Sequence, residues 1–418
     1  MEVAVAVVGA GAAGLSLAAA LTADEAGRLG DVALLDPGGR AAPAGRTWCC
    51  WAPPGGPYQA AVEHTWPRLR VVGRDGTVRE RDLAPLRYTM LRSERLGELL
   101  DDWFRRRPTV RRITAHVTEV AEVPGGAVVR GRRPDGRPVS VRARWVFDSR
   151  PPTVLPPCRT AWLQHFRGWF LRTERPVFTP DTVTWMDFRT PQPTHGLSFG
   201  YVLPLSPHRA LVEYTEFSRA PLTDRAYETA LDHYTRRVLR LGRLAVEARE
   251  QGAIPMCDAA FPRRVGRSVF RVGTAGGATR PATGYTFAAI QRQAAGIAEA
   301  LRRGRTPLPP RPYPWRHRQL DAVLLRALDG GRLDGARYLE ELFARVPLPR
   351  LLRFLDGRST PWEEAAVVLG VPGAVWPLLR TALTLPLRPR RPVALPAPGA
   401  VGGGAATPVG GRAGEAAR

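Results

Sequence analysis

The stretch that decides the fold runs from Val3 to Gly14 and reads Val-Ala-Val-Ala-Val-Val-Gly-Ala-Gly-Ala-Ala-Gly. Its first six residues are all apolar, which is typical of a parallel strand buried on both faces. A glycine-rich turn follows, and the alanine- and leucine-rich segment after it predicts a helix over residues 12–23. A second apolar strand is expected over residues 32–35 and ends at Asp36. Together these segments predict one βαβ unit.

The glycine turn predicts a dinucleotide site. Glycines permit a tight turn and let backbone N–H groups approach a pyrophosphate, and the helix N-terminus adds partial positive charge. A carboxylate at the end of the second strand can accept hydrogen bonds from a ribose. The strand–turn–helix context separates this fingerprint from an isolated glycine pattern. The predicted contacts are Gly9, Gly11, Gly14 and Asp36.

A second glycine segment lies far downstream, from Gly273 to Tyr285. It follows a strand expected over residues 268–272 and precedes a helix expected over residues 286–302. NAD and FAD share the first fingerprint, but a cofactor contacted by two sequence-distant segments indicates FAD. The predicted contacts in this segment are Gly273, Gly276, Gly277, Pro281, Thr283 and Gly284.

The chain changes character between the two glycine segments. Strand-like runs at residues 182–189, 197–203 and 210–217 indicate an antiparallel sheet, whereas residues 221–249 are expected to be helical. We therefore predict an α/β (α+β) fold. Its expected parts are a Rossmann-like FAD-binding domain (1–150 plus 263–305), an inserted antiparallel β-sheet substrate domain (151–262), a C-terminal helical region (306–386) and a disordered tail (387–418).

Composition limits the possible partners. The chain has 418 residues and a formal net charge of +23, and its basic residues other than histidine are all arginine. These arginines are scattered rather than interleaved with aromatic residues, so nucleic-acid binding is not expected. The dispersed histidines and cysteines predict no metal site. No run of about 18 apolar residues and no signal peptide is found. We expect a cytoplasmic protein lying peripherally on the cytoplasmic membrane, its basic surface against anionic lipid.

Seven further motifs follow one another along the chain, and with the glycine segments they resemble the lycopene cyclase family of flavoproteins over residues 3–365. Two departures from related patterns stand out. Thr274 replaces the aspartate typical of flavin hydroxylases, which cyclase-like sequences often lack as well. Cys50 stands where the family tends to carry an aromatic residue. The seven motifs are Arg46–Trp51, Gln164–Trp169, Met186–Arg189, Tyr201–Leu205, Leu211–Thr215, Glu250–Met256 and Arg353–Arg358.

Glu213 is the predicted acid. In a strand it shares a face with Leu211 and Phe217, and apolar surroundings raise the pKa of a carboxyl group. A neutral carboxyl near pH 7 can act as a general acid, and the resemblance places the family's essential acidic residue at this position. The alternative is a partly exposed strand glutamate. Asp187 is expected on the face of Val183 and Trp185, where it either positions a proton or holds Arg189 in an ion pair.

Aromatic residues are predicted to line a substrate tunnel. Their rings can contact a long polyene and stabilise a cation by roughly 0.5–2 kcal/mol each. The alternative for any one of them is an ordinary place in the core. The predicted substrate-binding residues are Trp48, Trp51, Trp185, Phe199, Tyr201 and Tyr285, and Trp169 belongs to the same aromatic set.

The resemblance implies a non-redox, proton-initiated cyclisation of the ψ end groups of lycopene to β-type rings. It also implies reduced FAD, NADPH as the electron source, and a lipophilic carotenoid as the substrate. Two alternatives stay open. One is a prenyl or carotenoid reductase or hydroxylase on the same scaffold. The other is a non-catalytic flavoprotein that binds a carotenoid.

Overall fold

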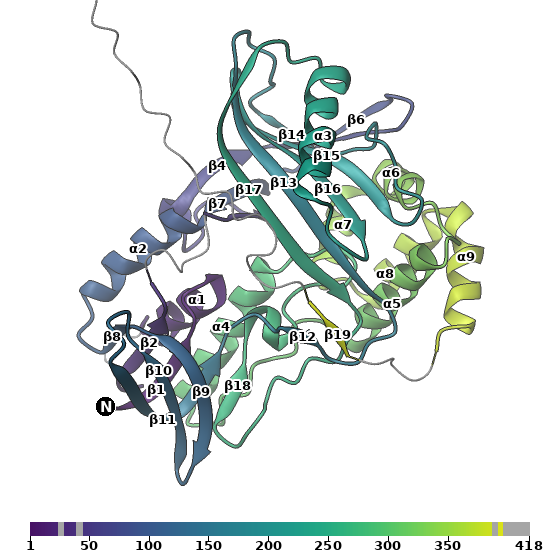
Figure 1. Cartoon of the computed structure of the whole chain (residues 1–418). Helices are drawn as coiled ribbons and strands as arrows, with labels where there is room; N and C mark the ends of the chain where they lie inside the picture. Colours follow the sequence, from purple (N-terminus) through teal and green to yellow (C-terminus); the bar gives the residue numbers. More distant parts are fainter. Residues whose placement is uncertain (24–28, 39–44, 387–391, 396–418) are drawn as a thin grey trace, which may run out of the picture.

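Two seven-stranded sheets dominate the computed structural model, which describes residues 1–23, 29–38, 45–386 and 392–395 (Figure 1). One sheet contains the N-terminal strand. The other sheet stands beside it. Helix α3 (Asp224–His233) lies on the outer face of this second sheet, and the helices between Trp315 and Leu383 pack near its opposite side. The predicted glycine segments follow strands of the first sheet, and Glu213 lies on the second.

The first sheet is built around β1 (Glu2–Val8), which pairs in parallel with β2 (Val32–Asp36) and β11 (Pro138–Asp148). The valines of β1 are buried. Helix α1 (Ala12–Leu21) follows the glycine turn and packs beside α4 (Phe287–Arg302). The predicted βαβ unit is confirmed. The remaining strands are β8 (Val110–Thr114), β9 (His116–Val123), β10 (Gly126–Arg132) and β18 (Val269–Arg271).

The second sheet confirms the three predicted strand-like runs and adds strands to them. Its order is β17–β13–β16–β15–β14–β5–β6, antiparallel except where β14 meets β5. Strands β5 and β6 come from the predicted FAD-binding domain, so the boundary of 1–150 is wrong for this segment. The bounds are β5 (Arg68–Val72), β6 (Val78–Asp82), β13 (Ala161–Thr173), β14 (Thr182–Asp187), β15 (Leu197–Ser206), β16 (Arg209–Ser218) and β17 (Leu244–Cys257).

The helix expected over residues 221–249 is wrong in its second half. Helix α3 (Asp224–His233) continues as a π-helical turn, η3 (Tyr234–Val238). The chain then reverses through Arg240 and Gly242, with φ of 53° and 71°. Residues from Leu244 onward join β13 as strand β17. Their alanine, arginine and glutamate content favours helix, but pairing along the whole length of β13 overrides that local preference.

A small three-stranded sheet lies between the two cores. It consists of β3 (Thr47–Ala52), β7 (Arg87–Arg92) and β4 (Val62–Trp66), and α2 (Ser93–Arg105) follows it. The side chains of β3 alternate between the cores. Trp48 and Cys50 pack against the core around α1 and α4, whereas Cys49 and Trp51 belong to the core of the second sheet. Strand β3 is therefore a wall shared by both cores.

The predicted C-terminal helical region is present and packs against the second sheet, where Leu325, Phe343 and Leu351 share a core with Leu211. Among the described residues no single helix is long and apolar enough to cross a membrane; α8 and α9 meet that test only as a pair bent by 115°. The helices are α5 (Trp315–Asp329), α6 (Gly335–Arg345), α7 (Leu348–Leu355), α8 (Pro361–Leu369) and α9 (Pro372–Leu383).

The disordered tail predicted for residues 387–418 lies mostly outside the described residues. Within it, β19 (Val393–Ala394) pairs with β12 (Val154–Leu155). This part of the prediction is wrong, because two residues with free backbone groups complete a short antiparallel ladder.

Candidate functional site

The N-terminal glycine turn has the geometry of an anion cradle. A Cβ atom on Gly14 would lie 1.8 Å from the carbonyl oxygen of Gly9, so no other residue fits at 14. Gly9 itself has a φ of 95°. A Cβ on Gly11 would meet nothing within 4 Å, so the space in front of the helix is open. The N-cap residue of α1 is Gly11, which has no side chain to cap the helix, so within the described part of the chain the first N–H groups of α1 can bind an anion.

The late glycine segment meets this turn in space. A Cβ on Gly273 would lie 2.7 Å from the Cβ of Ala13. Its strand β18 pairs in parallel with β11, as β1 does, so the two glycine turns follow the carboxyl ends of the strands on either side of β11. A Cβ on Gly276 would lie 2.4 Å from the carbonyl oxygen of Arg271, and Gly277 takes a φ of 76°. The sequence-distant segments predicted to share one cofactor are therefore adjacent.

The end of the late segment faces the second sheet. A Cβ on Gly284 would lie 2.3 Å from the Oε1 atom of Gln164 on β13. This Oε1 atom and the hydroxyl of Thr283 are buried and have no hydrogen-bond partner among the described residues. Asp36 lies at the end of β2, and its carboxylate pairs with Arg112 at 3.1 Å. The open turn, the free N–H groups and the unpaired polar atoms fit an FAD molecule.

Glu213 occupies the predicted buried position on β16. It pairs with Tyr201 of β15 and with Gly168 of β13, and the residue is only 7% exposed. Burial raises the pKa of its carboxyl group well above the usual range, and the neighbouring Glu250 carboxyl raises it further. A raised pKa favours the neutral carboxyl, which is the form that can donate a proton.

Glu250 is a site residue that sequence reasoning did not identify as one. Its Oε2 atom accepts hydrogen bonds from the hydroxyl of Thr47 at 2.7 Å and from Arg92 at 2.9 Å. It lies beside Glu213, although the two residues are on different strands. The available signal was the motif Glu250–Met256, but nothing in that motif says which residue Glu250 faces.

A hydrogen-bonded aromatic cluster adjoins Glu213. The indole N–H of Trp185 donates to the hydroxyl of Tyr285 at 2.7 Å, and the hydroxyls of Tyr88 and Tyr201 lie 2.8 Å apart. Tyr88 joins the two halves, 3.2 Å from the Tyr285 hydroxyl. Burial raises the pKa of Tyr88 and of Tyr201 well above the usual range, so both phenols are neutral donors. Trp51 packs edge-on against Tyr285 with ring centroids 4.7 Å apart.

The structure thus brings together four of the predicted substrate-binding aromatics: Trp51, Trp185, Tyr201 and Tyr285. The other two lie elsewhere. Trp48 stacks on Phe287 at the start of α4, with ring centroids 6.0 Å apart, and so lies on the cofactor side of β3. Phe199 belongs to the same core as the cluster, where it packs edge-on against Phe188 and Phe217.

Asp187 does not join this cluster. Pairing with both neighbouring strands shifts between Thr184 and Asp187, so the expected alternation with Val183 and Trp185 fails. The carboxylate instead accepts a hydrogen bond from Tyr234, which belongs to the core under α3 on the other face of the sheet. It also binds Arg189 at 2.6 Å. These contacts correspond to the ion-pair alternative.

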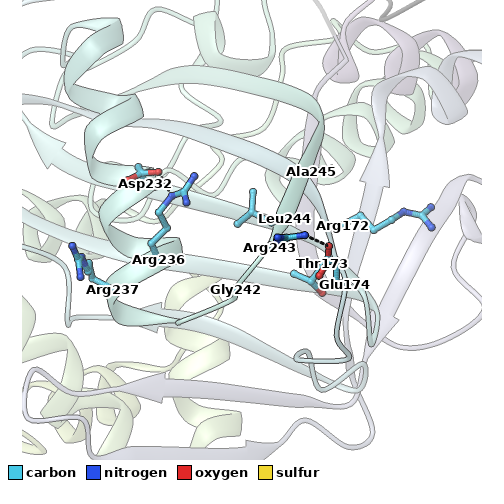
Figure 2. A pocket seen from close by; sticks show the side chains of 10 residues that line it. All are labelled: Arg172, Thr173, Glu174, Asp232, Arg236, Arg237, Gly242, Arg243, Leu244 and Ala245. Atoms are coloured by element: carbon cyan, nitrogen blue, oxygen red, sulfur yellow. Dashed lines mark hydrogen bonds and ion pairs between the residues drawn. The ribbon is translucent and has the colours of Figure 1, made fainter. Parts of the chain in front are cut away.

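An open surface cleft of about 930 Å³ lies at the far end of β13. Figure 2 shows Arg236 beside Asp232 on one side, and Arg243 paired with Glu174 on the other. It contains none of the predicted site residues. Among the residues that the structure describes, no cluster of histidine, cysteine and carboxylate side chains could hold a metal ion.

Comparison with known families identifies the chain. Residues 4–382 match the family described as lycopene cyclase protein. The chain belongs to the lycopene cyclase family. The match includes both glycine segments, Glu213, Glu250 and the aromatic cluster. The resemblance seen in the motifs is therefore confirmed.

Curated relatives of this cyclase-family chain are distant. A lycopene beta-cyclase from Pseudescherichia vulneris is 29% identical over 199 residues, which cover 43% of this chain and 50% of the relative. A lycopene beta-cyclase from Paracoccus sp. (strain N81106 / MBIC 01143) is 32% identical over 247 residues, covering 55% of this chain and 61% of the relative. The chain thus spans about half the length of the curated relatives it matches.

Solved structures show the same fold. A geranylgeranyl bacteriochlorophyll reductase-like protein from Thermoplasma acidophilum matches with a TM-score of 0.64 and 13% identity, over 91% of this chain and 99% of its own. A flavoprotein/dehydrogenase from Cytophaga hutchinsonii matches with a TM-score of 0.60 and 14% identity, over 92% and 99%. The predicted fold class is confirmed: this cyclase-family chain has the mixed α/β fold of FAD-dependent oxidoreductases.

Proposed function

We propose that this protein is a lycopene β-cyclase, which closes the ψ end groups of lycopene or a similar acyclic carotene into β-type rings. The single observation that carries the proposal is Glu213, a buried carboxyl with a raised pKa beside a cluster of neutral aromatic side chains. The family match and the flavoprotein scaffold support it.

Glu213 acts as the acid in the proposed reaction. Its neutral carboxyl gives a proton to the terminal alkene, the neighbouring double bond attacks the resulting carbocation, and a six-membered ring closes. A proton then leaves the ring, so the product is an isomer of the substrate. The rings of Trp51, Trp185 and Tyr285 exclude water from the cation, and their faces stabilise it by roughly 0.5–2 kcal/mol each.

The proposed cofactor is FAD in its reduced form, with NADPH as the reductant. Gly9, Gly11 and Gly14 would hold the pyrophosphate with the N-terminus of α1, and Asp36 would bind the ribose. The segment from Gly273 to Gly284, including Pro281 and Thr283, would contact the remainder. When bound, the electron-rich ring system supplies negative charge that stabilises a cation nearby.

We also propose that the protein docks on the cytoplasmic face of a membrane through α8 and α9, because the substrate dissolves in lipid. Trp376, Leu379 and Leu383 lie on one face of α9, and Trp376 and Leu383 are 68% and 77% exposed. On α8, Trp362 is 86% exposed. Exposed apolar groups of this kind favour the lipid–water interface, and Figure 1 shows α9 at the outer edge of the molecule. The net charge of +23 favours anionic lipid.

The decisive experiment is cyclisation in heavy water. The flavin-loaded protein, reduced with NADPH, is given lycopene in vesicles, and the products are examined by mass spectrometry. A cyclase adds one solvent deuteron per ring. Incorporation of deuterium from labelled NADPH, or of oxygen, would instead identify a reductase or a hydroxylase.

The substitution Glu213→Gln completes this test. We expect cyclisation to fall by about 10²–10⁴-fold, because the proton donor is removed, while flavin binding is retained. The matched control is Glu216→Gln, on the same strand but on the face of Tyr214. A protein that only carries a carotenoid would bind it equally well in both variants and form no rings.

A further inference from the structure

Glu213, Gly168 and Glu250 form one row across the second sheet. Gly168 on β13 pairs with Glu213 on one side and with Glu250 on the other. Residues directly opposite one another in antiparallel strands project to the same face. Both carboxyl groups therefore stand on the same face, at either side of a position that has no side chain.

The missing side chain at Gly168 is what lets the two carboxyl groups meet. A Cβ atom at this position would lie 2.8 Å from the Cγ atom and 3.2 Å from the Oε1 atom of Glu213. The Glu213 side chain thus occupies the space that a side chain at position 168 would need. An alanine would occupy the space across which Glu213 reaches Glu250.

Glu250 is held on its far side. Thr47 and Arg92 both donate to its Oε2 atom, at 2.7 and 2.9 Å, and the guanidinium offsets a negative charge there. Its Oε1 atom is buried and has no hydrogen-bond donor among the described residues. A proton on the adjacent Glu213 carboxyl would satisfy this oxygen, whereas two ionised carboxylates would repel each other.

We propose that Glu250 is the positioning residue for Glu213: its carboxylate accepts the Glu213 O–H above Gly168, so that the pair holds one proton and points it. This inference rests on the proposed function of Glu213 as the acid. Each ring takes one proton from Glu213 and gives one back, so the pair begins and ends the reaction with a single proton. Repulsion between the two carboxylates after the transfer favours the return of that proton.

Other titratable groups also face Glu213. Tyr201 on β15 pairs with Glu213, and the thiol of Cys49 on β3 lies near both residues. Burial raises the pKa of the Tyr201 hydroxyl and of the Cys49 thiol, so both groups are neutral. The pair also contacts a charged group, Arg92 on β7, which binds Glu250 at 2.9 Å. The substitution of Glu250 therefore removes the negative charge that acts on Glu213.

Infrared spectroscopy of the full-length, flavin-loaded protein tests the pair directly. The carbonyl stretch of a protonated carboxyl is followed from acidic to alkaline pH, and Glu213→Gln identifies the band of Glu213. In Glu250→Gln we expect the midpoint of this band to fall by about one pH unit or more. The control Glu247→Gln removes a carboxylate from the same strand that binds Arg172 and Arg209, and should leave the midpoint unchanged.

Gly168→Ala is the second variant, because it keeps both carboxyl groups but separates them. It should also lower the midpoint, and the pH at which kcat/KM falls on the alkaline side should move with it. An equal midpoint in the wild type and in Glu250→Gln would contradict the proposal that Glu250 holds the proton of Glu213. So would an equal shift in Glu247→Gln.

The same samples separate this inference from the proposed function, since ring formation is measured independently. If the midpoint falls in Glu250→Gln but the wild type makes no cyclic product, the pair stands and the cyclase proposal fails. If the wild type makes rings and the midpoint does not move, the cyclase proposal stands and the pair fails.

Discussion

Gly273 lies against the side chain of Ala13, so close that a Cβ on Gly273 would come 2.7 Å from the Cβ atom of Ala13. The two residues are far apart in the sequence and belong to the two glycine segments. Their contact joins the late segment to the first turn of α1, and we expect the proposed flavin site to depend on it.

Gly273→Ala should abolish flavin binding. The φ of Gly273 is 63°, which costs a non-glycine residue about 1–2 kcal/mol, and the clash with Ala13 must also push the two segments apart. Gly304→Ala is the matched control, because its φ is 65° and a Cβ there meets nothing within 4 Å. Flavin absorbance per chain after reconstitution measures the effect. Equal flavin content in the two variants would show that the contact is not needed.

Tyr285→Phe should destabilise the aromatic cluster. It removes the acceptor of the Trp185 indole N–H, and a buried donor left without a partner costs about 1–3 kcal/mol. Denaturant unfolding measures this loss. Tyr338→Phe, on α6 in the same core, removes a hydroxyl that accepts no indole hydrogen bond and should cost less. We also expect KM for the carotene to rise in Tyr285→Phe, since Trp51 packs against this ring.

His165 should make the protein less stable as the pH falls from 6.5 towards 4. Burial lowers the pKa of His165 from 6.5 to about 4, so between these values the unfolded chain binds a proton that the native protein does not. The free energy of unfolding then decreases by up to about 1.4 kcal/mol for each pH unit. His165→Gln removes this contribution, so the difference in stability between wild type and variant should narrow below pH 6.5. Parallel stability curves for the two proteins would contradict this.

The α8–α9 surface should control binding to vesicles. Replacing both Trp376 and Leu383 with serine removes two exposed apolar side chains. We expect the partition coefficient of the protein between vesicles and buffer to fall at least about tenfold. Sedimentation with phosphatidylglycerol vesicles measures this. Val265→Ser changes an exposed apolar residue in the loop before β18 and should bind like the wild type. Unchanged sedimentation of the double variant would show that this face of α9 does not bind the membrane.

Local patterns predicted the parts of the fold that depend on neighbours in sequence. The apolar run of β1 and its glycine turn predicted the first sheet and α1, because the strand, the turn and the helix all lie within one βαβ unit. The alternation of Leu211, Glu213 and Phe217 correctly predicted that Glu213 is buried. A period of two is enough when the strand is regular.

Predictions failed where pairing between distant segments decides the outcome. The irregular pairing of β14 sends Asp187 to the other face, and its sequence shows no sign of the shift. Strands β5 and β6 join the second sheet although they lie in the predicted first domain. Glu250 meets Glu213 only through the register of β13 with both neighbours. Register of this kind is set by the whole sheet.

Strand β3 contributes side chains to both hydrophobic cores, so a change in this strand can affect both. Because its odd and even positions look into different cores, inserting or deleting one residue would exchange the side chains presented to each. Trp48 would then lie in the core of the second sheet, with Glu213, and Trp51 in the core around α1 and α4, beside the proposed flavin site. Replacement of a single residue in β3 therefore changes one core, whereas a change in the length of β3 changes both, so the two cores constrain the length of this strand.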